Sequence, residues 1–460
     1  MFLNKITYDL HSSFGALISG RKKFHPKDRI YRKSRLDENL YTQDIHVNGD
    51  WTSSQHYQDL YNPINNALAS LKVQLKEGKL ELLKLPDLYE DLENLEPVAE
   101  YFIENFNDVI VLGTGGSSLG GKAIHQLADS PNMNGPNLYF IDSVDPRTFN
   151  SLLNKITPEK TGFIVISKSG QTAETITQFL LCLDIYRIKL NQYIIHNHFL
   201  IITEYTNNPL RRLANNWKLK IANHNQDIGG RYSALSIVGL FPALVAGIDA
   251  YAIREGAKNL LVQLKNAESP EHFPPAMGAL FNTALNIELG INSTVLMPYL
   301  DQLDLFSSWF QQLWAESLGK QGFGTTPIRA LGTVDQHSQL QLYLDGPKDK
   351  IFTLILSQLK NQGGLISNDY SQDPELKFIA GKRMGDLMDA QQEATAKTLI
   401  NRGCPTRLIR IKTLDEKTLG ALLMHFMLET VLTASILNLN AFDQPAVEES
   451  KARAKSYLLG

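Results

Sequence analysis

The sequence predicts an α/β protein with two parallel sheets, one following the other along the chain and each covered by helices on both faces. Short apolar runs bounded by turn residues alternate with helical patterns from Asn107 onward, which is typical of parallel strands joined by helices. The alternation pauses at residues 268–276, where prolines interrupt the helical pattern, and then resumes. A chain of 460 residues with 43% hydrophobic and 20% charged residues can bury the two cores that this architecture needs.

The chain up to residue 95 has a mixed, polar pattern, and we expect it to form an N-terminal arm packed on the larger domain. Within it, residues 63–77 have a helical pattern that Gly78 can end. The two alternations then assign residues 96–250 to a first, smaller domain and residues 251–460 to a second, larger one. We expect the active cleft between these two domains.

Each sheet is predicted from apolar runs that are short enough to be strands. Helices are expected between them, and residues 416–438 are apolar enough to form a core helix. The expected strands are residues 109–113, 138–143, 162–167 and 199–203 in the first sheet, and 293–299, 351–357 and 406–412 in the second. The expected helices include residues 233–248, 250–267 and 306–318.

The composition excludes several classes of protein. With 45 Lys plus Arg against 48 Asp plus Glu, the formal net charge of -3 excludes a nucleic-acid binder driven by bulk positive charge. Two cysteines, Cys182 and Cys404, cannot build a disulfide framework or a four-thiolate zinc site, so we expect buried thiols in a reducing cytoplasm. The start of the chain lacks the apolar core of a signal peptide, and no run of about 18 apolar residues predicts a membrane span.

A strand, a glycine-rich loop and a helix follow one another in VIVLGTGGSSLGG, residues 109–121. As a dinucleotide-binding loop it lacks the last glycine, although Asp142 could bind a ribose. As a Walker loop, residues 116–122 fit, but Ala123 replaces the hydroxyl residue that holds magnesium. As a sugar-phosphate loop, its serines, Ser117 among them, supply donors without a metal. A tight turn without a ligand is the fourth interpretation.

A second strand, loop and helix at residues 163–175 repeats this architecture. Its loop offers the hydroxyls of Ser167, Ser169 and Thr172 together with Lys168, just before a helix N-terminus. A helix cap accounts for one hydroxyl and not for three. The cluster therefore favours a phosphate monoester as the ligand of both loops.

The pattern of residues 306–318 predicts a helix that Asp304 can cap and Gly319 can end. Glu316 lies on the same face as Gln312, four residues earlier, and beside the apolar stripe. Partial desolvation there is expected to raise the pKa of Glu316 toward that of a usable general base. The alternative is a surface glutamate at the edge of a helix.

Two further residues carry chemistry in loops. Arg231 follows Gly229 and Gly230, where its guanidinium can face an anion or a developing oxyanion, or simply form a loop salt bridge. His337 lies in a polar turn and is a candidate for proton transfer. No histidine has zinc-ligand spacing, and His425, within an apolar run, is expected to be a packed core residue.

Near the C-terminus a helix is predicted with Asp443 as its cap. Gln444, Glu448 and Lys451 then share one face of that helix. Taken alone, Lys451 is typical of a solvated helix lysine.

In order along the chain these segments read VLGTGGSSLGG, ISKSGQTAET, GGRYSALSIVGL, WFQQLWAESLGKQG, GTVDQHSQLQLYLDGP and FDQPAVEESKARAK. Together they resemble the glucose-6-phosphate isomerase (phosphoglucose isomerase) family, in a shorter bacterial form. The resemblance extends from about Asp108 to the C-terminus. It implies two sugar-isomerase (SIS-type) three-layer α/β/α domains with N- and C-terminal helical extensions. It also implies a homodimer, glucose 6-phosphate and fructose 6-phosphate as substrates, and no metal or other cofactor.

The resemblance also implies roles for individual residues. Glu316 would be the base that moves a proton between C2 and C1, and Arg231 would stabilise the enediolate oxygen. His337, donated by the neighbouring subunit, and Lys451 would assist ring opening. Sugar hydroxyls would be bound by Gln312 and Gln444, and the phosphate by Ser117, Ser167, Ser169 and Thr172, with Gly116 and Lys168 lining the loops.

The departures from the family pattern concern loop geometry. Thr114 stands where an apolar residue is common, Gln171 where many members have a hydroxyl, and Ala446 and Ser450 where many have glycine. A non-catalytic sugar-phosphate sensor is the main alternative, but it would not need the base, the arginine, the histidine and the lysine together. A nucleotide-dependent oxidoreductase is disfavoured by the missing glycine of the first loop.

Overall fold

The computed structural model describes residues 39–48, 51–128, 135–190 and 194–460. Its first sheet consists of five parallel strands in the order β3-β2-β4-β5-β6. The interior strands are buried because hydrophobic side chains point to both faces, as in Val109 to Leu112. The strands are β2 (Asp108–Leu112), β3 (Asn137–Ile141), β4 (Thr161–Ile166), β5 (Phe199–Glu204) and β6 (Lys220–His224).

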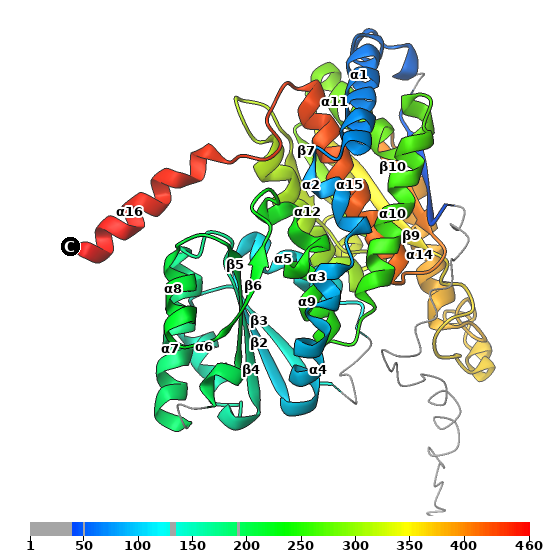
Figure 1. The fold of residues 1–460 in the computed structure, drawn as a ribbon. Helices are drawn as coiled ribbons and strands as arrows, with labels where there is room; N and C mark the ends of the chain where they lie inside the picture. The colour runs from blue at the N-terminus through cyan, green and yellow to red at the C-terminus, as the bar shows by residue number, and fades with distance from the viewer. Residues whose placement is uncertain (1–38, 49–50, 129–134, 191–193) are drawn as a thin grey trace, which may run out of the picture. The chain divides into compact units, whose positions relative to one another are not determined.

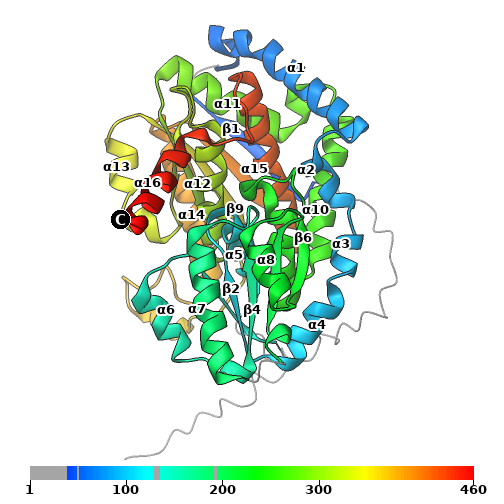
Figure 2. The same ribbon diagram turned by 60° about the vertical axis from the view of Figure 1, so that its left-hand side comes forward.

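The second sheet has the order β1-β10-β9-β7-β8. Four of its strands are parallel, and β1 pairs with β10 in the antiparallel direction, Tyr41 opposite Ile411. The strands are β1 (Tyr41–His46), β7 (Ser293–Pro298), β8 (Thr326–Arg329), β9 (Lys350–Ser357) and β10 (Thr406–Ile411). Figures 1 and 2 show both sheets with the helices that cover them.

Helices cover both faces of each sheet. One core is formed by the outer face of the first sheet with α6, α7 and α8, and another by the face of the second sheet that packs on α13 and α14. The facing sides of the two sheets share the largest core with α4, α5, α9, α10, α12 and α15. The helices of the first half are α1 (Gln55–Glu77), α2 (Glu81–Lys84), α3 (Glu90–Glu93), α4 (Glu96–Asn105), α5 (Leu119–His125), α6 (Pro146–Leu153), α7 (Ala173–Lys189), α8 (Pro209–Asn216) and α9 (Ile237–Val245). Those of the second half are α10 (Ala250–Asn266), α11 (Pro274–Leu289), α12 (Asp304–Leu318), α13 (Leu340–Asp345), α14 (Met384–Asn401), α15 (Glu416–Ile436) and α16 (Glu448–Leu459).

Helix packing and the side chain of Gln126 help to join the two halves. Helix α5, which follows β2 of the first sheet, packs on α12, which follows β7 of the second sheet. Between them, Gln126 donates to the carbonyl of Asp301 at 3.3 Å and accepts from the N–H of Leu305 at 2.6 Å. The start of α12 is thereby fixed against the C-terminal end of α5.

All seven strands predicted from apolar runs are present, and the long apolar helix is α15. By length and composition α15 could cross a membrane, but 83% of its most apolar window is buried inside the fold, as in a core helix. His425 and both cysteines are buried as predicted. Of the predicted N-terminal arm, residues 1–38 lie outside the described residues, and the boundaries at residues 95 and 250 stay predictions.

Three details of the fold were predicted wrongly or missed. Strands β1, β6 and β8 were not predicted, since polar residues interrupt their apolar pattern. Asp304 does not cap α12 with its side chain but pairs with Arg329. Asp443 does not cap a helix either, because a 3₁₀ turn at Pro445–Val447 precedes α16 and the Asp443 carboxylate binds Lys320 at 2.7 Å. Both carboxylates have a cation within reach, which outcompetes the backbone N–H groups.

Candidate active site

The centre of the candidate site is Arg231, at the start of a 3₁₀ turn over Gly230–Leu235. Its side chain is only 2% exposed, and its guanidinium donates to four neutral oxygens. Nε binds Ser317 Oγ at 2.7 Å, and Nη2 binds the carbonyls of Ala441 at 2.5 Å and Asp443 at 3.0 Å. Nη1 binds Gln444 Oε1 at 2.8 Å. This set of acceptors fixes both the position and the plane of the guanidinium.

Glu316 completes this centre from α12. Its Oε2 lies 3.3 Å from Nη1 of Arg231, and its Oε1 accepts from Nε2 of Gln312 at 3.0 Å. The Glu316 side chain is 34% exposed, whereas the arginine beside it is buried. A carboxylate held from two sides and still open to a ligand is the geometry that a general base requires. The prediction that Gln312 and Glu316 share a face is confirmed.

The loop after β2 lies directly beside this centre. A Cβ on Gly116 would come within 2.2 Å of the backbone of Gly230, and Ser233 Oγ donates to the Gly116 carbonyl at 3.1 Å. A Cβ on Gly115, whose φ is +56°, would meet Nε2 of Gln312 at 3.0 Å. Glycines are therefore needed in this loop for close backbone approach. The half-buried Ser117 ends the 3₁₀ turn Gly115–Ser117, at the edge of the Arg231 and Gln312 cluster.

The loop after β4 lies next to the first one, because β2 and β4 are paired in parallel and both loops leave the same edge of the sheet. Ser167 Oγ and Thr172 Oγ1 are 3.0 Å apart, so two of the three predicted hydroxyls converge. Ser169 Oγ accepts from the N–H of Gln171 at 3.2 Å and leaves its own proton to donate. Lys168 Nζ donates to the carbonyl of Gln226 at 2.6 Å and lies 3.5 Å from Glu204 Oε1.

Two of the predicted residues are not joined to this centre within the described part of one chain. His337 is exposed in a 3₁₀ turn over Val334–His337. Lys451 lies on α16, where its side chain is 64% exposed and pairs with Glu448 at 2.7 Å. No side chain of α16 is buried, and Figure 1 shows this helix extending away from both sheets.

The turn that carries His337 is fixed by hydrogen bonds to Asp335 and Gln336. Burial opposes ionisation of Asp335, but hydrogen bonds from Gln339, the N–H of Leu331 and Ser338 outweigh it and lower the pKa of this carboxyl. Gln336 accepts from the Tyr299 hydroxyl at 2.9 Å. The histidine is thus an exposed side chain on a rigid turn.

Of the residues that hold Arg231, the sequence pointed to Gln444 and Glu316 but not to Ser317. Ser317 is fully buried, and its Oγ lies 3.0 Å from the Tyr232 hydroxyl as well as accepting from Arg231. Lys320 ties down the segment after α15 through Asp443. The one available signal was Ser317 within the apolar stripe of α12, a position where a hydroxyl needs a polar partner.

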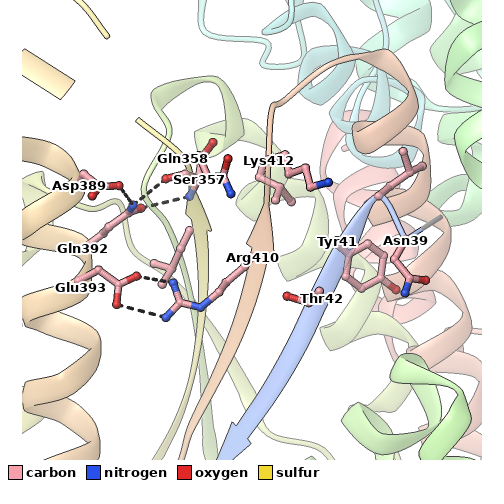
Figure 3. A pocket seen from close by; sticks show the side chains of 13 residues that line it. Asn39, Tyr41, Thr42, Ser357, Gln358, Asp389, Gln392, Glu393, Arg410 and Lys412 are labelled. Atoms are coloured by element: carbon pink, nitrogen blue, oxygen red, sulfur yellow. Dashed lines mark hydrogen bonds and ion pairs between the residues drawn. The ribbon is translucent and has the colours of Figure 1, made fainter. Parts of the chain in front are cut away.

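A separate cavity of about 240 Å³ lies at the carboxyl ends of β9 and β10, beside α14 (Figure 3). Arg410 Nη2 binds Glu393 Oε2 at 3.2 Å in its wall, and Gln392 Nε2 binds the carbonyl of Ser357 at 2.7 Å. None of the predicted site residues lines it. Among the described residues, no group of three or more His, Cys, Asp or Glu side chains is arranged to hold a metal ion.

The chain is similar to known proteins over most of its length. The family model described as phosphoglucose isomerase matches residues 86–458. A glucose-6-phosphate isomerase of Rubrobacter xylanophilus is 35% identical over 82% of this chain and 88% of that protein. The crystal structure of a hypothetical protein from Thermus thermophilus has a TM-score of 0.79 at 30% identity and covers 91% of this chain and 100% of that one.

A crystal structure of a glucose-6-phosphate isomerase from Chlamydia trachomatis has the same fold, with a TM-score of 0.69 at 22% identity over 80% of this chain and 73% of that one. The predicted fold class, parallel α/β sheets of the sugar-isomerase type, is confirmed by this likeness and by the two sheets described above. The chain belongs to the phosphoglucose isomerase family.

Proposed function

We propose that this protein is an aldose-ketose isomerase that interconverts D-glucose 6-phosphate and D-fructose 6-phosphate, the exchange used in glycolysis and gluconeogenesis. The observation that carries the proposal is the pairing of an accessible carboxylate, Glu316, with a buried and fully oriented guanidinium, Arg231. Membership of the family supports it. The two buried thiols further suggest a cytoplasmic protein.

In this proposal Glu316 removes the proton from C2 of the open-chain aldose, and the C1 carbonyl oxygen gains the negative charge. The cis-enediolate is stabilised by Arg231, whose orientation is fixed before the substrate arrives. The protonated Glu316 then returns the proton to C1, and the hydroxyl proton of O2 passes to O1, so that C2 becomes the ketone carbonyl and C1 carries the hydroxyl. One base at the level of both carbons is sufficient for the carbon-bound proton, and atoms and charge balance without a redox partner.

The substrate is held at its two ends. We assign the phosphate to the two loops of the first sheet, with Gly116, Ser117, Ser167, Lys168, Ser169 and Thr172 around it, because their hydroxyls and helix N-termini gather at one sheet edge. Gln312 and Gln444 flank Glu316 and Arg231, where they can bind sugar hydroxyls. Binding energy from the phosphate then positions C1 and C2 at the base.

The direct test is conversion of fructose 6-phosphate to glucose 6-phosphate by the purified protein in the presence of a chelator. We expect turnover with the metal removed and very poor turnover of unphosphorylated fructose, because the phosphate loops would stay empty. Competition by inorganic phosphate is expected for the same reason. Absence of isomerisation, or equal use of free fructose, would overturn the proposal.

We further propose a homodimer in which His337 of one subunit serves the site of the other, with His337 and Lys451 transferring the proton that opens the sugar ring. This is motivated by the exposure of His337 on a turn that hydrogen bonds fix, such as the bond from Tyr299 to the neighbouring Gln336. A Glu316→Gln chain and a His337→Ala chain are each expected to be inactive. Refolded together, about half the dimers are mixed and each holds one intact site, so about a quarter of wild-type activity should return.

Tags of two kinds, one on each chain, show whether mixed dimers have formed. Efficient formation of mixed dimers with no recovered activity would mean that His337 acts within its own chain. A monomer in solution would contradict the shared site altogether.

A further inference from the structure

The second phosphate loop, residues 167–172, rests on a neighbouring segment, residues 203–210, that the proposed function does not use. The carbonyl of Lys168 accepts two hydrogen bonds from it, from the N–H of Glu204 at 3.1 Å and from the Thr203 hydroxyl at 3.2 Å. The carbonyl of Gly170 accepts from the N–H of Leu210 at 3.1 Å. The carbonyls of Lys168 and Gly170 therefore both point toward the supporting segment, residues 203–210.

The planarity of the peptide bond gives this arrangement a consequence for ligand binding. In a trans peptide the carbonyl of one residue and the N–H of the next point in opposite directions. With the Lys168 carbonyl turned toward Thr203, the N–H of Ser169 points away from the supporting segment. That N–H donates to no other group in the part of the chain that the structure describes. It is thus free to bind an anion.

Asn208 fixes the direction of the supporting hydroxyl. Its side chain is buried, with 3% exposed, and its Nδ2 donates to Thr203 Oγ1 at 3.1 Å. Because Thr203 accepts this bond, its single hydroxyl proton is directed to the Lys168 carbonyl. Asn208 also lies directly beneath the loop, since a Cβ on Gly170 would come within 1.9 Å of Asn208 Oδ1. Gly170, with φ at +61°, is the residue that permits this contact.

We propose that Asn208 and Thr203 are positioning residues that aim the donors of the second loop at the phosphate of the substrate. They touch no substrate themselves and act through the Lys168 carbonyl and the Ser169 N–H. The inference rests on the proposed function, because it takes the anion at this loop to be the phosphate of a sugar phosphate.

The experiment compares two pairs of variants. Thr203→Val keeps the shape of the buried side chain and removes its hydroxyl, whereas Thr203→Ser keeps the hydroxyl. Asn208→Ser keeps a side chain that can cap α8, where Asn208 accepts from the N–H of Arg211, but is too short to reach Thr203. Asn207→Ser, at the exposed neighbouring position, is the matched control.

For Thr203→Val and Asn208→Ser we expect KM for fructose 6-phosphate and the inhibition constant of inorganic phosphate to rise together by ~10-fold or more. This is the effect of losing one hydrogen bond to a charged group, here the bond from the Ser169 N–H to the phosphate. At saturation kcat should stay within about threefold of wild type, since Glu316 and Arg231 are untouched. Thr203→Ser and Asn207→Ser should behave as wild type. An unchanged KM in Thr203→Val, or a fall in kcat alone, would overturn the proposal.

Two controls keep the outcomes distinct. Thermal unfolding of each variant shows whether it is folded, and if Asn208→Ser is not, the Thr203 pair decides. If the wild-type protein does not isomerise sugar phosphates, the proposed function fails, and calorimetric binding of inorganic phosphate takes the place of KM. Weaker binding by Thr203→Val than by Thr203→Ser would then still support the positioning role, and equal or absent binding would reject it.

Discussion

In the part of the chain that the structure describes, two buried arginines, Arg231 and Arg407, are each paired with a glutamate, in very different surroundings. Arg231 and Glu316 lie at the junction of the two sheets, and the glutamate is 34% exposed. Arg407 and Glu429 lie within the second sheet and its helices, 2.7 Å apart and both with no exposed side-chain area. The same two chemical groups thus form an open pair and a sealed pair.

The partners of the two pairs explain the difference. Around Arg231 the acceptors are carbonyls and a hydroxyl. The N–H groups of the guanidinium therefore have hydrogen-bond partners other than Glu316, and the carboxylate stays accessible. Around Glu429 the carboxylate itself is saturated, by Arg407, by Asn282 at 3.0 Å and by His425 at 3.0 Å. Access to the carboxylate, and not burial of the arginine, therefore separates a site for chemistry from a structural pair.

The largest expected effect is on catalysis at the open pair. Glu316→Gln keeps the shape and the hydrogen bond from Gln312 but cannot accept a proton, so turnover should fall by ~10²–10⁴-fold. The free energy of unfolding should change by less than ~1 kcal/mol, since a partly exposed ion pair contributes little. Steady-state kinetics and thermal unfolding measure the two quantities. Near-normal turnover would remove Glu316 from the mechanism.

The next effect concerns the sealed pair and should show the opposite pattern. Glu429→Gln leaves the charge of Arg407 uncompensated in the core, and we expect a loss of ~3–5 kcal/mol in the free energy of unfolding. At a temperature where the variant is still folded, turnover should be close to wild type. A stable Glu429→Gln protein would show that this pair is not the structural element described above.

A smaller, matched test uses one tyrosine from each cluster. Tyr41 binds Nδ1 of His425 at 2.6 Å in the sealed cluster, and Tyr232 contacts Ser317 and the Ala441 carbonyl in the open one. Each change to Phe leaves a buried polar group unpaired, at a cost of ~1–3 kcal/mol. Only Tyr232→Phe should also lower turnover, because it loosens the acceptors of Arg231. Equal turnover in the two variants would contradict the distinction.

The smallest effect is a pH dependence of stability. Burial lowers the pKa of His425 below 6.5 despite the nearby Glu429 carboxylate, so the unfolded chain binds this proton more tightly. The contribution of His425 to the free energy of unfolding is therefore fully present above pH 6.5. It is lost as the pH falls below 6.5, by at most ~1.4 kcal/mol per pH unit for one proton. His425→Gln should show a shallower loss between pH 6.5 and 5.5 in denaturant titrations, and the exposed His272→Gln should not.

The other groups around His425 titrate elsewhere. Burial opposes ionisation of Glu429, but Arg407 and His425 outweigh it and lower its pKa below 4.5, so its own contribution is lost only in more acidic solution. Burial raises the pKa of Tyr41 far above the neutral range. If His425→Gln and wild type lost stability in parallel, His425 would not be the group that titrates.

How far the sequence predicts this structure depends on the range of the interactions. Apolar runs predict β2 or β9 because their side chains are buried on both faces, whereas β1, at the edge of its sheet, has no such local pattern. Spacing of four predicts the contact of Gln312 with Glu316 because both lie on one helix. The contact of Arg231 with Glu316, 85 residues apart, follows from the packing of the two halves, and only the family resemblance pointed to it.

The sealed pair was not predicted from the sequence. Arg407 and Glu429 come from β10 and α15, and the partners of Glu429 come from α11 and from α15 itself. Neither residue stands in a motif. Their proximity depends on the crossing of helices over the sheet, which no local pattern encodes.

The most direct test of the open pair is the proton transfer itself. Fructose 6-phosphate is incubated in D₂O with wild type, Glu316→Gln or Glu429→Gln, at a temperature where all three are folded, and deuterium at C1 of fructose 6-phosphate and C2 of glucose 6-phosphate is followed by NMR. Wild type and Glu429→Gln should incorporate deuterium at similar rates, and Glu316→Gln should incorporate it ~10²–10⁴-fold more slowly while still binding the substrate. Deuterium incorporation by Glu316→Gln at close to the wild-type rate, or its loss in folded Glu429→Gln, would contradict the assignment of the open pair as the catalytic one.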